Sequence, residues 1–259
     1  MRLKIVSFNA NGIRARLPIV VQWMEKEAPD VLCIQETKVQ DPDFPKAPFE
    51  NLGYHACYKG EKSYNGVAVL TRSKPELVRI GLKEGDETEE SRLIAVHVDG
   101  IPFVNTYVPQ GQDPDSEKFK YKIGWLNALL DYFKKHYRPD QPLVWTGDFN
   151  IAPEAIDVYD PETLSGNIGF HPEEHKMLNT LKDWGFVDVF RRHKTEAKLY
   201  TFWDYRIPNG VKRNLGWRID HIWATACLAE KSKDAWIDRD ARLLPRPSDH
   251  TFIIADFDL

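Results

Sequence analysis

Residues 93–108 read LIAVHVDGIPFVNTYV, two apolar and β-branched runs on either side of an Asp-Gly pair. Asp99-Gly100 is a favoured two-residue connection of a β-hairpin. The stretch therefore predicts two antiparallel strands, at Leu93–Val98 and Ile101–Val108. Similar short runs predict further strands at Leu3–Phe8, Val31–Gln35, Val67–Thr71, Leu143–Thr146, Arg218–Ala224 and Phe252–Phe257.

Three stretches have helical patterns. Leu17–Lys26 carries Pro18 near its expected first turn. Ser116–His136 repeats apolar residues at helical spacing, so it should pack on a sheet. Pro172–Asp183 starts with an acidic turn and is followed by Gly185, a typical helix stop. Strands and helices mixed in this order predict a layered α/β protein with much antiparallel pairing, and we expect one domain over residues 1–259.

The composition limits the classes of function. The net charge is −4 and the pI about 6.1, whereas DNA-binding modules that rely on bulk attraction are usually strongly basic. A polyanion would have to be bound by local Arg and Lys clusters together with a divalent cation. The N-terminus has no signal-peptide pattern and no apolar run is long enough to span a bilayer. We expect a protein of the cytoplasm, associated with the nucleoid, or of the nucleus in a eukaryote.

Polar side chains stand where several predicted strands end. Such a position is rigid and faces a cleft. Glu36 is separated from the apolar run VLCI at 31–34 by Gln35 alone, and carboxylate oxygens with few other ligands suit Mg²⁺. Asp148 and Asn150 follow Gly147 and project the same way at strand spacing, so they could take a water proton and hold a phosphate oxygen. Taken singly, Glu36 is equally consistent with a surface glutamate, and the amides Asn9 and Asn11 with an Asx turn, while GDFN is moderately specific.

An aspartate and a histidine can also be paired near the end of the chain. His250 follows Ser248 and Asp249, just before the last predicted strand. Asp220 lies in the segment GWRID and could orient the His250 imidazole. A lone histidine is more often structural than catalytic, so the pairing with Asp220 is what favours a catalytic role.

Six motifs occur in one order along the chain. They are NANG at 9–12, QETK at 35–38, NTYVPQG at 105–111, GDFN at 147–150, GWRID at 216–220 and SDH at 248–250. The ordered set resembles the exonuclease III family of the endonuclease–exonuclease–phosphatase superfamily, over nearly the whole chain. The segment TFWDYR at 201–206 is a further match. The resemblance implies a deoxyribonuclease I-like, four-layer α/β sandwich: two packed mixed β-sheets flanked by helices, with the site at one end.

The resemblance also implies roles for residues at the matching positions. The implied metal site consists of Asn9, Glu36, Asp148, Asn150, Asp249 and His250. The implied catalytic set consists of Tyr107, Asp148, Asn150, Asp220 and His250. The expected cofactor is Mg²⁺, as one or two ions, with Mn²⁺ as a substitute. Whether Asp148 acts as base, acid or water-holder stays open.

The implied activity is Mg²⁺-dependent hydrolysis of DNA phosphodiester bonds in base excision repair. The enzyme would cut 5′ to abasic sites and trim 3′ ends, on double-stranded DNA with abasic or 3′-blocked lesions and without an obligate protein partner. The expected pocket for the abasic sugar consists of Asn11, Gln110, Phe202, Trp203, Arg206, Trp217 and Ile219. Its aromatic members could instead belong to the core. Possible phosphate contacts are Arg72, Lys118, Lys122, Arg206 and Arg213.

Three alternatives remain at this level. A phosphodiesterase or phosphatase for a non-DNA substrate would share Glu36, Asp148, Asn150 and His250, but would not need GWRID or TFWDYR. A non-catalytic nucleic-acid-binding protein would not need to keep Glu36, Asp148 and His250. The segment HPEEH at 171–175 fits the HxxEH pattern of some zinc peptidases, but its proline predicts a helix start there and argues against a zinc site.

Overall fold

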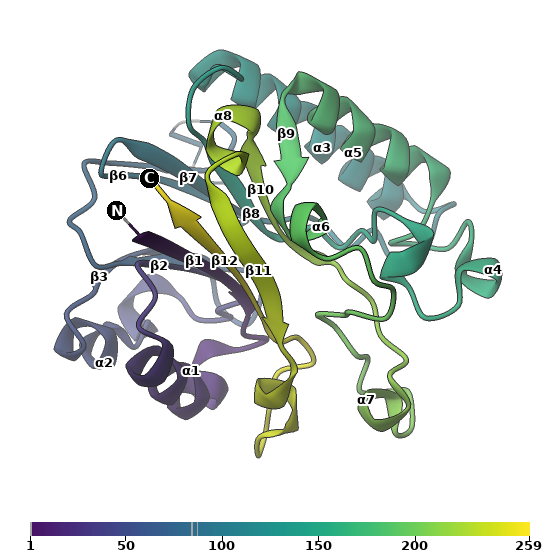
Figure 1. Cartoon of the computed structure of the whole chain (residues 1–259), viewed down its shortest axis with the longest axis horizontal. Coiled ribbons are helices and arrows are strands. Elements are labelled where there is room, and N and C mark those ends of the chain that lie inside the picture. Colours follow the sequence, from purple (N-terminus) through teal and green to yellow (C-terminus); the bar gives the residue numbers. More distant parts are fainter. Residues whose placement is uncertain (1, 84, 87) are drawn as a thin grey trace.

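The computed structural model describes residues 2–83, 85–86 and 88–259, and these residues form two six-stranded β-sheets packed face to face (Figure 1). In order across the first sheet, the strands are β11 (Ser232–Asp238), β12 (Phe252–Asp258), β1 (Arg2–Asn9), β2 (Val31–Gln35), β4 (Val67–Thr71) and β3 (His55–Lys59). In the second sheet they are β5 (Leu77–Ile80), β6 (Leu93–Val98), β7 (Ile101–Tyr107), β8 (Val144–Asp148), β10 (Asp220–Thr225) and β9 (Phe186–Asp188).

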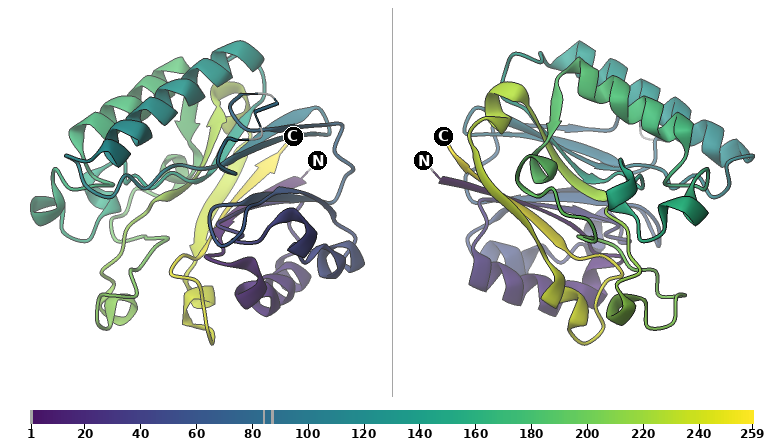
Figure 2. Two further views of the ribbon diagram at one scale, coloured as in Figure 1. Left: turned by 180° about the vertical axis from the view of Figure 1, so that it is seen from behind. Right: turned by 45° about the vertical axis from the view of Figure 1, so that its right-hand side comes forward.

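Helices cover the outer face of each sheet (Figures 1 and 2). The first sheet is covered by α1 (Ile13–Glu27) and α2 (Lys46–Asn51), and the second by α3 (Glu117–His136) and α5 (Pro172–Trp184). Shorter helices are α4 (Pro161–Leu164), α6 (Val189–His193), α7 (Gly210–Arg213) and α8 (Ala226–Ala229), with 3₁₀ turns at Asp41–Asp43, Ala155–Asp157 and Arg239–Leu243. The predicted four-layer α/β sandwich of two mixed sheets is confirmed.

Among the described residues, three of the apolar clusters hold the layers together. One lies between the sheets and includes Ile5, Ile94 and Ile222, all fully buried. The other two lie under the helices on the outer faces. Burial of one large aliphatic or aromatic side chain stabilises a fold by about 1.5–3 kcal/mol, so the stacked layers are favoured strongly over separate sheets.

The hairpin at Asp99-Gly100 is confirmed. Strands β6 and β7 pair antiparallel, and Val98 lies opposite Ile101. Asp99 has φ 50° and Gly100 has φ 75°. Positive φ at both central positions is what the turn matching the right-handed twist of paired strands requires.

Helix α1 begins earlier than predicted. It starts at Ile13, so Pro18 lies inside the helix and not in its first turn. The start is set by tertiary contacts, because the N–H groups of Gly12 and Ile13 donate to the carbonyls of Glu36 and Thr37 at 2.8 and 3.0 Å. These bonds anchor the first turn, so the helix tolerates the loss of the one backbone hydrogen bond that Pro18 cannot donate.

Each sheet contains one parallel pair of strands near its centre, and this pairing locates the site. Strand β1 runs parallel to β2, and β7 runs parallel to β8. Because the two sheets pack on each other, the carboxyl ends of these four strands come together at one end of the sandwich. The loops that carry α7 and residues 239–243 project at this end (Figure 1). Among the described residues, no helix has both the length and the apolar character needed to cross a bilayer.

Candidate active site

Six predicted residues lie on strand ends that converge. Asn9 and Tyr107 end β1 and β7, Asp148 ends β8, and Glu36 follows β2. Two antiparallel neighbours begin at the same place: Asp220 starts β10 opposite Asp148, and His250 precedes β12. Side chains far apart in the sequence thus meet because parallel and antiparallel strands share one edge.

The backbone after β2 turns sharply to present Glu36. Glu36 and Lys38 have φ angles of 49° and 52°, in the left-handed region that non-glycine residues rarely adopt. The N–H of Thr37 donates to Gly66 O at 3.1 Å, and a Cβ on Gly66 would lie 2.0 Å from Thr37 Oγ1. Only glycine fits at position 66, and this close approach helps to hold the strained turn.

Asn9 joins the two central carboxylates. Its Nδ2 donates to Glu36 Oε1 and to Asp148 Oδ2, both at 2.8 Å, while its Oδ1 accepts the N–H of Asn11 at 2.9 Å. The amide therefore presents its donor side to the carboxylates. In this arrangement Asn9 holds the two acidic groups near each other. Its amide presents no oxygen to a cation bound between them.

Burial and like charges control the ionisation of Asp148. Its carboxylate is buried, and Nε2 of His250 lies 3.8 Å from Oδ2. Burial, together with the nearby Asp220 and Glu36 carboxylates, raises the pKa of Asp148 to about 7, although His250 acts against the shift. Asp148 is therefore able to accept or release a proton near neutral pH.

The His250 imidazole is held by Asp220. Nδ1 of His250 donates to Asp220 Oδ2 at 2.8 Å, which leaves Nε2 facing Asp148. Burial lowers the pKa of His250, but the Asp220 and Asp148 carboxylates more than offset this effect and raise it to about 10. Without a bound cation, the ring is an imidazolium that can donate from Nε2.

Glu36 and Tyr107 complete the polar floor of the site. Burial raises the pKa of Glu36, but the Lys38 ammonium, 2.7 Å from Oε2, produces a net lowering. The Tyr107 hydroxyl lies near Glu36, and burial together with the Glu36 and Asp148 charges raises its pKa well above the usual value. Tyr107 thus stays protonated and serves as a hydrogen-bond donor. The guanidinium of Arg92 stacks 4.8 Å from the ring centroid.

These residues fit a divalent cation. One ligand atom each from Glu36, Asp148 and His250 lies within 4.8 Å of the others. Two carboxylates in one buried site repel each other, as the raised pKa of Asp148 indicates, and a cation would relieve that repulsion. Asp249 and Asn150 line the adjoining cleft, and the Asp249 carboxylate accepts from Asn11 Nδ2 at 2.9 Å.

A cleft of about 670 Å³ opens beside these groups, with one apolar wall. Phe202, Trp217 and Ile219 line it, together with Gln110 and Arg206. The Phe202 ring centroid is 4.8 Å from that of His250. The cleft therefore brings an apolar surface directly against the titratable groups.

Two residues expected in the pocket lie elsewhere. Trp203 is buried behind the wall, and its Nε1 donates to Asn214 Oδ1 at 3.2 Å. A Cβ on Gly216 would lie 2.7 Å from that nitrogen, so the ring is packed into the fold and does not line the cleft. Asn11 lies between Asp249 and Lys38, hydrogen-bonded to both, and is not part of the lining.

Lys122, predicted as a possible phosphate contact, and the segment HPEEH both have structural roles. Lys122 cannot contact a phosphate, because its side chain is fully buried in an ion pair with Glu174. The segment HPEEH forms the start of α5, where His171 Nδ1 accepts the N–H of Glu173 at 3.2 Å. Nε2 of His175 instead bonds Ala152 O at 2.9 Å, so the two histidines have structural partners.

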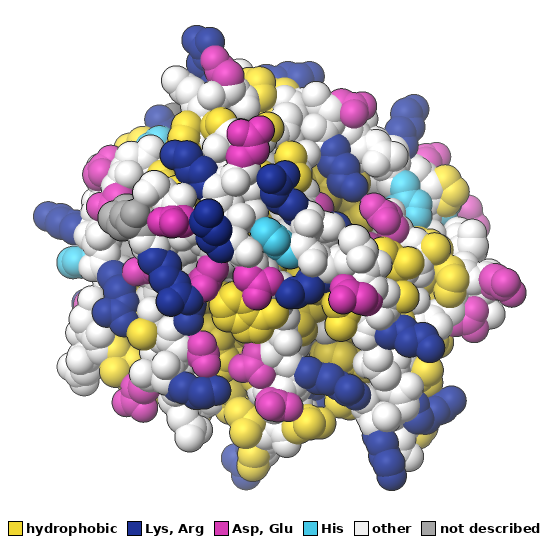
Figure 3. Space-filling view, viewed as in Figure 1, with side chains coloured by type: hydrophobic (Ala, Val, Ile, Leu, Met, Phe, Trp, Pro, Cys, Tyr) yellow, Lys and Arg dark blue, Asp and Glu magenta, His cyan; other side chains and the backbone are white. Residues whose placement is uncertain are grey.

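Sequence reasoning gave no role to two residues of the site. Lys38, in the QETK motif, neutralises part of the Glu36 charge, and Arg92 stacks on Tyr107. The proximity of Lys38 to Glu36 in the motif was a usable signal, whereas Arg92 belongs to no motif. Across the face drawn in Figure 3, Lys and Arg side chains are interspersed with Asp and Glu, as the small net charge predicts.

Comparisons with known proteins agree with this geometry. The Endonuclease/Exonuclease/phosphatase family matches residues 6–250. Exodeoxyribonuclease III of Haemophilus influenzae is 36% identical over 98% of this chain and 100% of that protein. An exodeoxyribonuclease of Bacillus subtilis is 31% identical over 92% of this chain and 94% of its own length.

Solved structures lead to the same family. An AP endonuclease from Archaeoglobus fulgidus superposes with a TM-score of 0.95 at 44% identity, covering 99% of this chain and 100% of the other. The 3′ phosphatase NExo from Neisseria, bound to a product DNA hairpin, gives a TM-score of 0.94 at 38% identity with the same coverage. The chain therefore belongs to the endonuclease/exonuclease/phosphatase family, and its predicted resemblance to the exonuclease III branch is confirmed.

Proposed function

We propose that this chain is a Mg²⁺-dependent DNA phosphodiesterase of base excision repair, which cuts 5′ to abasic sites and trims 3′ ends. The observation that carries the proposal is the buried Asp148, with a pKa of about 7, between Glu36 and His250 and beside an apolar cleft. The names of the relatives, exodeoxyribonuclease III and AP endonuclease, support DNA as the substrate.

Hydrolysis needs a nucleophilic water, relief of charge on the phosphate, and a proton for the leaving 3′-oxygen. The new P–O bond forms to the water oxygen as the bond to the 3′-oxygen breaks. Asp148, ionised above about pH 7, accepts the water proton in this scheme. His250 donates from Nε2 to the phosphate, and Asp220 keeps its ring oriented. The leaving 3′-oxygen takes its proton from a solvent water, and Asp148 returns the proton it accepted to solvent. Tyr107 and Asn150, which line the cleft, add donors to the crowded phosphate.

Glu36 and Asp148 are the carboxylates that would hold the cation. His250 lies within 4.8 Å of both, but its Nε2 supplies no ligand atom while it donates to the phosphate. A divalent ion there supplies Lewis-acid stabilisation of the phosphate charge. Oxygen-rich sites with few protein ligands suit Mg²⁺, and Mn²⁺ can replace it.

Selection of abasic sites follows from the apolar wall. A sugar without a base is the least costly group to extrude from a duplex, because little stacking or pairing is lost. Phe202, Trp217 and Ile219 offer it an apolar surface next to His250. A lipid or inositol phosphate would use the same polar groups but has no evident need for this wall.

The test uses duplex DNA with one tetrahydrofuran abasic analogue. We expect nicking 5′ to the analogue that needs Mg²⁺, stops with EDTA, and falls by about 10²- to 10⁴-fold in Asp148→Asn. Asp131→Asn, an exposed position on α3, is the matched control and should cut like the wild type.

Other outcomes are informative. Robust cutting by Asp148→Asn would remove the catalytic assignment, and cleavage of a phosphate monoester or lipid headgroup without any cutting of DNA would favour the non-DNA alternative. A second candidate activity is removal of 3′-phosphates, which the likeness to the Neisseria 3′ phosphatase supports. The same assay on 3′-phosphate and recessed ends measures it. The bacterial relatives support a place of action in the cytoplasm, at the nucleoid.

A further inference from the structure

A fully buried ion pair joins the two helices that cover the second sheet. Lys122 on α3 and Glu174 on α5 are both 0% exposed, and Nζ lies 2.5 Å from Oε1. Figure 1 shows these helices side by side. A buried ion pair is rarely more stabilising than apolar residues of the same volume. Its presence here points to a purpose other than the stability of the core.

The ammonium of Lys122 also bonds two segments of the cleft. Nζ donates to Asn150 O at 2.8 Å and to Gln110 O at 3.2 Å. Together with Glu174, these acceptors use all three of its N–H groups. Gln110 and Asn150 both line the cleft. One charge therefore joins the segment after β7 to the segment after β8.

Glu174 holds a third segment of the cleft. Its carboxylate accepts the N–H of Gly169 at 3.1 Å and that of His171 at 3.0 Å. A Cβ on Gly169 would lie 3.3 Å from Asn150 O and 3.4 Å from the Trp217 ring. The carboxylate thus holds this turn closely against both the proposed phosphate donor and the apolar wall.

Several hydrogen bonds fix the conformation of Asn150. Its φ of 51° is left-handed, a region that asparagine tolerates better than most residues with a Cβ. Its N–H donates to Asp148 Oδ1 at 2.8 Å, and its Nδ2 donates to Val108 O at 2.9 Å. The backbone carbonyl is the remaining polar group of its main chain, and Lys122 fixes it.

We infer that Lys122 and Glu174 are positioning residues, which act from behind the cleft to hold Asn150 and Gln110 in the orientation that the phosphate requires. Neither side chain reaches the substrate, because both are fully buried. The expected loss of DNA cleavage rests on the proposed function. The expected displacement of Asn150 rests on the hydrogen bonds alone.

The double variant Lys122→Met/Glu174→Gln tests the inference, because it removes both charges with little change in volume. We expect it to fold, and its kcat on the tetrahydrofuran duplex to fall about tenfold or more with KM changed less than about threefold, since misplacement of positioning groups acts mainly on the chemical step. Lys120→Met, exposed on the same helix, is the matched control and should keep both constants.

A second readout does not depend on DNA. In ¹H–¹⁵N spectra, the side-chain amide resonance of Asn150 should shift in the double variant and keep its position in Lys120→Met. This measurement separates the inference from the proposed function, because the resonances of wild type and variant can be compared even if neither protein cuts DNA. A folded double variant with wild-type kcat and an unmoved amide overturns the inference.

If the double variant does not fold, the single variant Glu174→Gln tests the positioning role. Glu174→Gln keeps the ammonium but loses the charged acceptor of the Gly169 and His171 N–H groups. A fall in kcat of about threefold or more supports the positioning role, and wild-type kcat overturns it.

Discussion

Asp148 has unusual chemistry because of four neighbouring side chains. Asn9 donates to its carboxylate, His250 lies 3.8 Å away, and Asp220 and Glu36 add negative charge to the same buried site. An exposed aspartate would be fully ionised at neutral pH and a poor proton acceptor. The raised pKa of about 7 makes Asp148 suited to proton transfer under physiological conditions.

The pH dependence of activity should reflect Asp148 directly. The ionised form is the one that accepts a proton and holds a cation, so kcat/KM should rise with pH through about 7 at low Mg²⁺ and then level off. Cation binding favours the ionised carboxylate, so higher Mg²⁺ should move this rise to lower pH. Rate profiles at several Mg²⁺ concentrations check both statements. A rise at the same pH for every concentration would contradict them.

Glycine has opposite effects on stability in the β6–β7 turn and in helix α3. Gly100 lies in the β6–β7 turn with φ 75°, and a Cβ there would meet no atom within 4 Å. Gly124 lies in the exposed interior of α3, also with open space at its Cβ. Backbone conformation alone therefore decides what an alanine does at each position.

We expect Gly100→Ala to lower the free energy of unfolding by about 1–2 kcal/mol, because alanine is strained at positive φ. Gly124→Ala should raise it by about 0.5–1 kcal/mol, because alanine is the better helix former. Urea unfolding curves of the two variants and the wild type measure both changes. Equal shifts in one direction would show that the turn and helix conformations do not control these positions.

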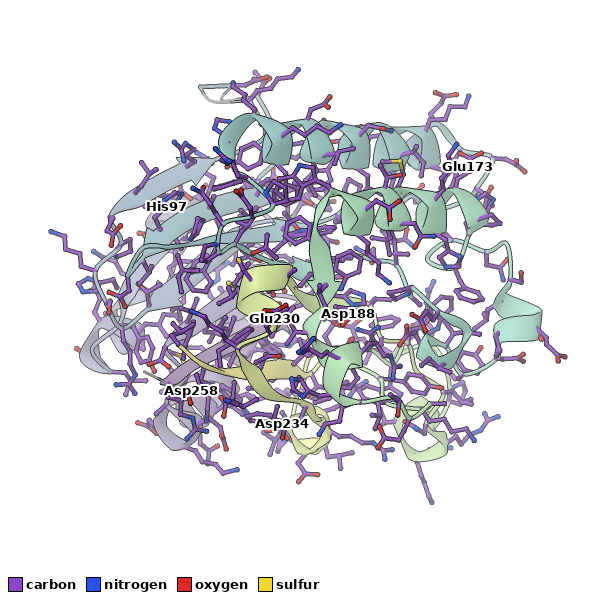
Figure 4. All side chains as sticks on the ribbon, turned by 45° about the horizontal axis from the view of Figure 1, so that its top comes forward. His97, Glu173, Asp188, Glu230, Asp234 and Asp258 are labelled. Atoms are coloured by element: carbon purple, nitrogen blue, oxygen red, sulfur yellow. The ribbon has the colours of Figure 1, made fainter. Side chains whose placement is uncertain are left out.

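A buried charge network connects distant parts of the whole molecule. The fully buried Arg218 donates to Asp157 at 2.6 and 3.0 Å, to Asp188 at 2.8 Å and to Nδ1 of His221 at 2.9 Å. Asp188 is labelled in Figure 4, where β9 meets α6. Since a guanidinium cannot accept a hydrogen bond, His221 keeps Nδ1 unprotonated and donates from Nε2 to Ile151 O at 2.9 Å.

Stability should therefore depend on the charge state of His221. Burial, followed by the Arg218 charge, lowers the pKa of His221 to about 3. The unfolded chain binds a proton below about pH 6.5 while the folded ring stays neutral, so stability is present above that pH and is lost as the pH falls towards 3, by up to about 1.4 kcal/mol per unit. As the pH is lowered from 7 to 4, the free energy of unfolding should fall less steeply in His221→Asn than in the wild type. Identical slopes for the two proteins would contradict a neutral, buried His221.

The central strands, the long helices and the order of the site motifs were predictable from the sequence. Each depends on a local pattern: apolar runs for β2 and β4, helical spacing for α3, and polar residues at strand exits such as Glu36. Local patterns record how a segment buries its own side chains, and buried central strands have the strongest patterns.

Tertiary structure alone decided the rest. The four strands that escaped prediction, β3, β5, β9 and β11, are the edges of the two sheets, where partial exposure weakens the apolar pattern. Lys122 shares the buried face with Trp125, but its partner Glu174 lies on another helix. Trp203 and Trp217 are equally aromatic, yet only Trp217 lines the cleft. Which groups meet across layers depends on how whole elements pack, and no single segment encodes that.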